Sequence, residues 1–272
     1  EEMRENFARD GAIKVAGLLD EDALKECRRC FDFNIANPGP TAFEVYEGTS
    51  DAHYNDLGTG KSLEIYEPML KKLDFAGFLA DLWGSEHVWY FGEEIFVKDG
   101  GKAGRTLWHQ DTPYFPADGR HLANIWISFE ALPAKNALEV VRGSHIGQMY
   151  DGTSFKDTNK PTEPLWGPEY YPTLPDIEAE RKADPDAWDI LSWDLAPGDA
   201  IVLHSGCLHG GAPIDSACPT RHTLVLRFFG DDLHYRPFPD AKPNYFMDLR
   251  AFDLPSLKAG DLYRSDEFLQ LR

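Results

Sequence analysis

The sequence lacks the features of membrane-spanning, secreted and disulfide-bonded proteins. No apolar run approaches the roughly 20 residues that a helix needs to cross a bilayer. The charged segment 1–5 contains no apolar signal core. Four cysteines in 272 residues are too few for a disulfide framework at this length. These absences predict a cytoplasmic protein that has no membrane partner.

Basic residues are also scarce. The chain has 27 lysines and arginines against 46 aspartates and glutamates, which gives a formal net charge of −19. A surface of this kind repels polyanions, so the charge balance argues against nucleic acid as a partner. Hydrophobic residues make up 42% of the chain, which is typical of a globular rather than a disordered protein. Composition assigns no oligomeric state.

A helix is predicted directly after Asp20. This residue can cap a helix with an acidic first turn, and Leu24, Cys27 and Phe31 then follow along one side. Cys27 and Cys30 form a C-x-x-C motif inside the same helical pattern. No second Cys/His pair stands at zinc-knuckle spacing, so we interpret both cysteines as packing residues.

A second helix is predicted over residues 67–83, ahead of Gly84. Its expected buried stripe consists of Leu70, Leu73, Phe78 and Leu82. The segment 37–60, between the two helices, is rich in Pro, Gly and Thr. We predict that it is a loop that crosses the entrance of a site.

From about residue 87 the pattern changes to short strands separated by Gly and Pro. No helical pattern lies between them, which favours an antiparallel barrel or jelly roll within a mainly β chain that has flanking helices. The segment from about 150 to 190 breaks this rhythm with six prolines, and we predict a lid-like insertion there. The strand candidates are 87–98, 122–132, 137–141, 200–204 and 222–229.

Two potential metal ligands are separated by a single residue. In His109-Gln110-Asp111, the outer side chains point to the same face if the segment is a β-strand. His209 lies far downstream, after the turn 196–199 and the apolar strand 200–203. Two histidines and a carboxylate form the three-sided set that binds ferrous iron and leaves positions open. The spacing therefore predicts an iron site that carries out chemistry.

Arg221 follows His209 after twelve residues. A 2-oxoacid bound to iron needs a cation for its far carboxylate, and arginine offers a fixed, two-pronged donor. Arg227 has the same strand parity and is the alternative to Arg221. His204 is the alternative to His209 as third ligand, although it has the opposite parity in a straight strand.

Several of these segments, taken in order, resemble the phytanoyl-CoA dioxygenase family. The resemblance is carried by residues 108–116, 124–128, 142–145 and 197–210, together with the opening pattern at 7–24. It covers about residues 5 to 230. The family has a double-stranded β-helix (jelly-roll, cupin-like) core, so the resemblance implies this core within an α+β chain. The chain departs from the family at Arg142, where proline is common, and in a spacing from His209 to Arg221 that is one residue longer than usual.

We expect residues 1–272 to form a single oxygenase domain with three parts. Residues 1–86 are expected to be a helical N-terminal support. Residues 87–230 are expected to form the β-helix core, with the lid-like insertion at about 150–190. Residues 231–272 are expected to be a C-terminal extension.

The resemblance implies an Fe(II)- and 2-oxoglutarate-dependent dioxygenase. With O2, such an enzyme hydroxylates or otherwise oxidises an unactivated C–H bond of a small organic molecule and releases succinate and CO2. The family's iron ligands correspond to His109, Asp111 and His209, its 2-oxoglutarate clamp to Arg221 and its pocket tryptophan to Trp126. The carboxylate of Asp111 argues against halogenation, because related halogenating enzymes have a small residue at that position.

The position after the third ligand favours His209 over His204, because Gly210 matches the family there. Residues near the iron motif are candidates for the substrate pocket, namely Trp108, Tyr114, Glu94 and Lys98. The alternative function is a non-oxygenase, cupin-like metal enzyme or ligand-sensing barrel. Arg221 and the Trp126 region separate the two hypotheses, because a simple metal-binding cupin needs neither.

Overall fold

A large antiparallel sheet is the main element of the computed structural model, which describes residues 1–58 and 62–272. Its strands are β1 (Ala12–Val15), β2 (Phe43–Val45), β3 (His53–Asp56), β4 (Val88–Lys98), β6 (Leu122–Ser128), β9 (Ala200–Leu203), β11 (Arg221–Gly230) and β13 (Leu269–Gln270). They follow the order β1-β9-β6-β11-β4-β3-β2, and β13 pairs with β4 outside this path. The prediction of a mainly β chain with flanking helices is confirmed, as are strands at all five predicted places.

A smaller sheet packs against the inner face of the large one. It consists of β7 (Leu138–Val141), β8 (Ile190–Leu191) and β10 (His209–Gly211), in the order β10-β7-β8. Trp126 and Val225 of the large sheet share one hydrophobic cluster with Leu138 and Val140 of the small sheet. A separate two-stranded ladder joins β5 (Ala117–Asp118) to β12 (His234–Tyr235). The space between the two main sheets contains the candidate site.

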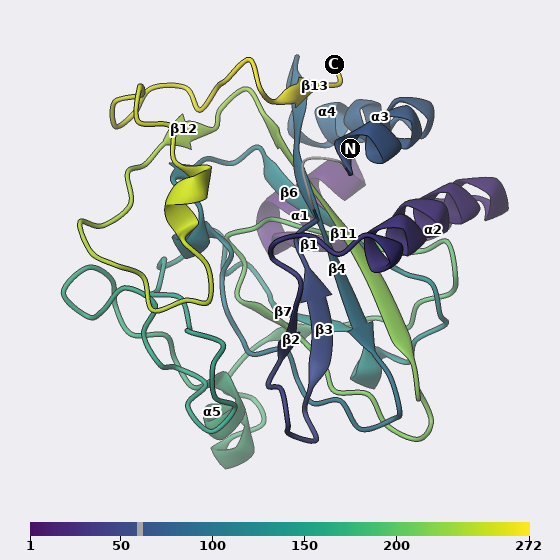
Figure 1. The fold of residues 1–272 in the computed structure, drawn as a ribbon, viewed down its shortest axis with the longest axis vertical. Helices are drawn as coiled ribbons and strands as arrows, with labels where there is room; N and C mark the ends of the chain where they lie inside the picture. The colour runs from purple at the N-terminus through teal and green to yellow at the C-terminus, as the bar shows by residue number, and fades with distance from the viewer. Residues whose placement is uncertain (59–61) are drawn as a thin grey trace.

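Four helices cover the outer face of the large sheet. They are α1 (Glu2–Asp10), α2 (Glu21–Ala36), α3 (Leu63–Lys72) and α4 (Phe75–Trp83). Figure 1 shows α2, α3 and α4 on one side of the sheet, and α5 (Ile177–Ala183) and the short helix Leu249–Phe252 on the opposite side. Phe31, Leu70 and Leu79 of the helices pack in one cluster with Ile125 and Leu226 of the sheet. None of the described helices is long and apolar enough to cross a membrane.

Alternating side chains determine what the central strands present to each side. In β11, Leu224, Leu226 and Phe228 are buried in the cluster beneath the helices. Because successive side chains of a strand point to opposite faces, their burial directs Arg221 and Arg227 toward the small sheet. β6 follows the same rule. The cavity-lining residues of these two strands are Asn124, Trp126, Arg221, Thr223, Val225 and Arg227.

The single helix predicted over 67–83 is wrong, because two helices lie there. α3 begins earlier, at Leu63, and α4 begins at Phe75. Between them, Asp74 has a left-handed backbone with φ 48°, and its carboxylate accepts a hydrogen bond from the backbone N–H of Gly77. Apolar residues continue on both sides of this break, so hydrophobic spacing alone does not reveal it.

The continuous loop predicted over 37–60 is also wrong. β2 and β3 pair with each other, and β3 extends the large sheet by pairing with β4. Positions 59 and 60 of the predicted loop lie outside the described residues. The segment does reach the site, because Phe43, Val45, His53 and Asn55 line the cavity.

The segment at about 150–190, called the insertion below after the sequence prediction, contains little regular structure apart from α5, and hydrogen bonds fix it. The buried carboxylate of Asp151 accepts backbone N–H groups of Gly152, Trp166 and Gly167. The hydroxyl of Tyr114 donates to the carbonyl of Thr153 and accepts its N–H. These contacts hold the start of the insertion against the segment that carries Asp111.

The cysteine interpretation is confirmed. Cys27 and Cys30 lie in α2, are fully buried and are free thiols. No described group of ligating side chains includes them. The C-x-x-C spacing here reflects packing of one helix face against the sheet.

A buried carboxylate lies on the helix-covered face of β4. Glu93 accepts a hydrogen bond from the Tyr90 hydroxyl at 2.6 Å and another from the Ser62 hydroxyl. Burial raises the pKa of Glu93, although these hydrogen bonds oppose the shift. A carboxyl group with a raised pKa in the folded state stabilises the fold most below its unfolded value, and this contribution is lost as pH rises.

We therefore expect Glu93→Gln to gain stability relative to the wild type as the pH rises from about 4.5. The difference in the free energy of unfolding should grow by up to about 1.4 kcal/mol per pH unit until the raised pKa is passed. Urea unfolding at several pH values measures it, with the exposed Glu86→Gln as control. A difference that does not change with pH would contradict the burial argument.

Candidate metal centre

His109, Asp111 and His209 place three potential ligand atoms within 4.8 Å of one another. Oδ1 of Asp111 lies 3.2 Å from Nε2 of His109 and 3.7 Å from Nε2 of His209. Asp111 and His209 are buried, and His109 is nearly so. The two imidazoles and one carboxylate oxygen thus converge on one point at the cavity wall.

Backbone pairing brings these distant segments together. His109 and His209 form an antiparallel bridge in which each N–H donates to the carbonyl of the other at 2.9 Å. The backbone N–H of Asp111 donates to the carbonyl of Ser205. Asp111 does not continue a strand, because it precedes a short 3₁₀-helix (Thr112–Tyr114) and has helical backbone angles. The expectation of one regular strand was therefore wrong, although the carboxylate and the imidazole still converge.

The tautomers of both histidines suit metal binding. Nδ1 of His109 lies 2.7 Å from the Leu107 carbonyl, and Nδ1 of His209 lies 2.9 Å from the Cys207 carbonyl. Because a carbonyl only accepts, each Nδ1 carries the proton and each Nε2 keeps a free lone pair. Burial lowers the pKa of His209 to about 4, which favours the neutral ring.

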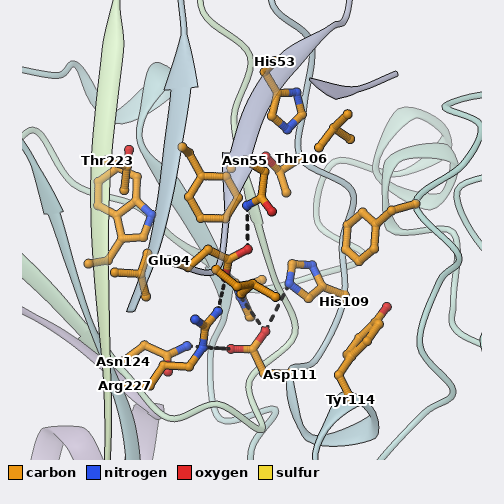
Figure 2. A pocket seen from close by; sticks show the side chains of 18 of the residues that line it. His53, Asn55, Glu94, Thr106, His109, Asp111, Tyr114, Asn124, Thr223 and Arg227 are labelled. Carbon is orange, nitrogen blue, oxygen red and sulfur yellow. Dashed lines mark hydrogen bonds and ion pairs between the residues drawn. The ribbon is translucent and has the colours of Figure 1, made fainter. Parts of the chain in front are cut away.

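A hydrogen-bond chain holds the outer oxygen of Asp111. Nδ2 of Asn124 donates to Oδ2 at 2.6 Å, and the Ser205 hydroxyl fixes Asn124 by donating to its Oδ1 at 3.0 Å. Nε of Arg227 lies 3.7 Å from the same carboxylate oxygen (Figure 2). Burial by itself would raise the pKa of Asp111, but the two imidazoles and Arg227 hold it below its usual range. Only Oδ1 remains directed at the histidines.

Arg227 is also engaged on its other side. Its guanidinium forms an ion pair with Glu94, and Nδ2 of Asn55 donates to Glu94 at 2.6 Å. Figure 2 shows this chain running from Asn55 through Glu94 and Arg227 to Asp111. The sequence identifies Arg227 and Glu94 as candidate site residues, but it does not identify Asn55 or Asn124. The parity of Asn124 with Trp126 was the available signal for its inward orientation.

His204 lies away from the three ligand atoms. Its Nδ1 accepts the N–H of Gly206 at 2.9 Å, and its Nε2 lies 2.9 Å from the carbonyl of Gly119. Both ring nitrogens are therefore used in backbone hydrogen bonds. The structure brings His209, and not His204, to His109 and Asp111.

One cavity of about 1040 Å³, part of it open to solvent, contains both the ligand set and Arg221. Arg221 is buried and donates to the carbonyls of Asn136 and Ala212. It forms no ion pair with any described carboxylate, and its guanidinium lies 5.7 Å from the ring centre of Trp126. Burial lowers its pKa to about 10. A buried cation without a counterion is favourable only where an anion binds.

Two of the four predicted pocket residues line the cavity, namely Tyr114 and Glu94. Lys98 does not line it, because its ammonium group turns toward the carbonyl of Gly104, at 2.5 Å. Trp108 does not line it either. Its ring contacts the Arg105 guanidinium and its Nε1 donates to Glu178, so it belongs to the contact with α5. For these two residues the pocket prediction was wrong.

The apolar wall combines the two segments that the sequence predicted as an entrance loop and a lid with C-terminal residues that sequence reasoning did not connect with the site. Phe43 of β2 and Phe155 of the insertion lie beside the C-terminal segment, and Phe155 packs 4.9 Å from the ring of His109. The signal that could have found the C-terminal residues is the density of aromatic residues at 245–252, because aromatic side chains are enriched at binding interfaces. The C-terminal residues that line the cavity are Tyr245, Phe246, Met247, Leu249 and Phe252.

A two-histidine, one-carboxylate set in a mainly β fold, with an unpaired arginine in the same cavity, defines an enzyme of the iron- and 2-oxoglutarate-dependent oxygenase superfamily. The chain belongs to the phytanoyl-CoA dioxygenase (PhyH) family, whose sequence model matches residues 7–223. No curated protein sequence matches the chain.

Solved structures with the same fold include SnoN, SnoK and EvdO2. The epimerase SnoN, in complex with Fe3+, alpha ketoglutarate and nogalamycin RO, has a TM-score of 0.69 and 18% identity over 100% of this chain and 98% of its own. The carbocyclase SnoK from nogalamycin biosynthesis has a TM-score of 0.68 and 15% identity over 100% and 96%. EvdO2 from Micromonospora carbonacea var. aurantiaca, complexed with 2-oxoglutarate, has a TM-score of 0.59 and 17% identity over 90% and 95%. At these identities the likeness shows the fold.

The hydrogen bond from Asn124 to Asp111 generates a prediction. We expect Asn124→Ala to weaken binding of Fe(II) or Co(II) roughly 10- to 100-fold, because Oδ2 of Asp111 loses its direct donor. Anaerobic competition with a chromophoric chelator measures the affinity. Ser205→Ala, which removes only the bond that orients Asn124, should cause a smaller loss, and the exposed Asn159→Ala should cause none. Unchanged affinity in Asn124→Ala would show that Asp111 does not need this support.

Proposed function

We propose that the protein is an Fe(II)- and 2-oxoglutarate-dependent dioxygenase that hydroxylates, or otherwise oxidises, a C–H bond of a small organic molecule. The observation that carries this proposal is the single cavity that holds both the His109, Asp111 and His209 set and the unpaired Arg221. The two facing sheets would be the two halves of a double-stranded β-helix. We also propose the three-part division of the chain at residues 86 and 230.

The donor set fits a ferrous ion. Two neutral imidazoles with free Nε2 atoms and one carboxylate oxygen match the nitrogen and oxygen ligands that non-haem iron uses, with further positions left for other molecules. His109, Asp111 and His209 would hold the ion. Asn124 and Arg227 would keep Asp111 bound through a single oxygen, because both interact with its Oδ2.

Arg221 fits the far carboxylate of 2-oxoglutarate better than Arg227 does. Arg227 already forms an ion pair with Glu94 and lies beside Asp111, so its charge is compensated. Arg221 has no such partner among the described residues, and its guanidinium borders the cavity beside Trp126. Thr223, on the same face of β11, has a buried hydroxyl oxygen without a described partner and would add a donor.

The bound metal and 2-oxoglutarate supply the oxidising chemistry, with O2 consumed and succinate and CO2 released. The chain's own residues orient the reactants and exclude water. Arg221 and Trp126 would fix the co-substrate at the inner end of the cavity. The aromatic wall around Phe155 would cover the metal on the outer side and limit the access of water.

The aromatic lining of the cavity favours an apolar substrate that carries a ring. Aromatic side chains from three segments border the cavity, while Glu94, Asn55 and Arg227 are engaged with one another. The net charge of −19 disfavours a coenzyme A ester, whose phosphates need a basic entrance. The epimerase and carbocyclase among similar structures make reactions other than hydroxylation legitimate outcomes of a product analysis.

The ligand assignment predicts the behaviour of four alanine variants. His109→Ala, Asp111→Ala and His209→Ala should each lose tightly bound iron, because two ligands remain. His204→Ala removes a buried histidine that is not one of the proposed ligands, so this variant should retain most of the metal. Iron quantified after gel filtration under anaerobic conditions gives the comparison. Equal loss in all four variants would show that the third ligand is assigned wrongly.

Turnover of 2-oxoglutarate tests the function itself. With Fe(II) and ascorbate, the wild type should form succinate, and a ring-bearing apolar substrate should raise the rate. Arg221→Gln should raise the KM for 2-oxoglutarate on the order of 100-fold, because a buried charge-assisted pair is lost. The exposed Arg120→Gln is the control. Absence of succinate, together with absence of metal-dependent 2-oxoglutarate binding, would favour the non-oxygenase alternative.

A further inference from the structure

His53 is a buried histidine on the cavity wall that none of the proposed steps uses. It begins β3, only 3% of its surface is exposed, and it lines the same cavity as Arg221. Its Nδ1 lies 3.2 Å from the carbonyl of Asp51. Its Nε2 is buried and has no hydrogen-bond partner among the described residues. An orphan polar atom at a ligand cavity requires an explanation.

The hydrogen bond to Asp51 defines the protonation of the ring. A carbonyl oxygen can only accept, so Nδ1 carries the proton and Nε2 of the neutral ring is a bare acceptor. A bare acceptor cannot hydrogen-bond to a carboxylate, which is also acceptor-only. The same ring becomes a donor on both sides when it binds one more proton.

The charged groups near His53 are Arg221, Lys98 and the carboxylate of Asp51. Burial lowers the pKa of Lys98 well below its usual value, and Asp51 opposes this shift. Lys98 of β4 and Arg221 of β11 lie next to each other in register and act on His53, and Arg105 lies close to both. Burial, the charge of Lys98 and, to a smaller extent, Arg221 lower the pKa of His53 to about 3. The hydrogen bond to the Asp51 carbonyl acts in the opposite direction. The Tyr46 ring packs edge-on against it at 5.7 Å. His53 is therefore neutral in the protein without ligand.

His53 and Arg221 lie near the same end of the cavity. A Cβ atom added to Gly211 would lie 2.8 Å from Nη2 of Arg221 and 3.2 Å from Oγ1 of Thr106, so these two groups flank one glycine. In Figure 2, His53 and Thr106 both lie at the end of the pocket away from Asp111. An anion held by Arg221 at this end therefore comes close to the orphan Nε2.

We propose that His53 takes up a proton from solvent when 2-oxoglutarate binds and donates a hydrogen bond from Nε2 to the far carboxylate. This inference rests on the proposed function. Both carboxyl groups of the co-substrate are ionised near neutral pH, so the ligand brings no proton of its own. The incoming negative charge offsets the field of Lys98 and Arg221, which is one of the causes that keep the free histidine neutral. Binding would be coupled to the net uptake of about one proton.

The coupling predicts a direction for the pH dependence of affinity. Between the low pKa of the free histidine and its raised pKa in the complex, the Kd for 2-oxoglutarate should increase on the order of tenfold per pH unit. The increase ends where the pH rises above the pKa of His53 in the complex, because neither state then carries the proton. A clamp made only of Arg221 would show no such slope, because arginine stays protonated over this range.

Calorimetric titration of 2-oxoglutarate into the full chain loaded with Zn(II) or Mn(II) counts the protons without turnover. The observed enthalpy is measured at about pH 7 in buffers that differ in ionisation enthalpy, and the slope against that enthalpy gives the protons taken up. We expect about one proton for the wild type and about zero for His53→Gln. Lys98→Met is the matched control, because Lys98 is the other buried group near Arg221 whose charge state can change. This variant should still take up about one proton.

The outcomes separate this inference from the function on which it rests. If the metal-loaded wild type does not bind 2-oxoglutarate, the proposed function fails. If it binds without proton uptake, or if His53→Gln takes up as many protons as the wild type, the role of His53 is overturned. Loss of uptake in Lys98→Met alone would assign the proton to Lys98 and would equally overturn the proposal. If His53→Gln does not fold, the proton counts of the wild type and of Lys98→Met still decide the question.

Discussion

The antiparallel pairing of β11 with β4 and β6 is the constraint on which the site depends. These three strands are buried on both faces, with helices on one side and the cavity on the other. Every apolar residue that anchors a strand under the helices therefore fixes the direction of its neighbours. Because Leu224 and Leu226 are buried under the helices, strand alternation alone directs the side chains of Arg221, Thr223 and Arg227 into the cavity.

Arg221 and Arg227 lie on the same face of β11 but have different surroundings. This difference gives each arginine its own role in the site. Arg227 is compensated by Glu94 and supports the carboxylate of Asp111. Arg221 is left without a carboxylate among the described residues. A buried charge is costly unless it is paired. The end of the cavity at Arg227 is therefore electrically compensated, whereas the end at Arg221 requires an anion.

Sequence reasoning located the chemistry because that chemistry depends on short-range spacing and strand parity. His109, Asp111, His209 and Arg221 could be found in this way even though Asp111 lies outside a regular strand. The hairpin β2–β3 and the break at Asp74 could not, because turns with left-handed residues leave little trace in hydrophobic periodicity. The placement of Trp108 failed for a related reason. Its partner Glu178 lies in the insertion, and no local pattern shows a contact over such a distance.

Much of the aromatic wall comes from chain segments that carry none of the proposed metal ligands or the carboxylate clamp, although Tyr114 and Phe115 follow closely after Asp111. The edge strand β2, the insertion and residues 245–252 supply this part of the wall. The inner strands β6 and β11 and the segments of His109, Asp111 and His209 supply the polar centre. Loops and terminal segments tolerate replacement far better than buried strands do. Recognition of the substrate can therefore diverge among relatives by exchange of the three segments of the wall, while the reactive centre is inherited unchanged.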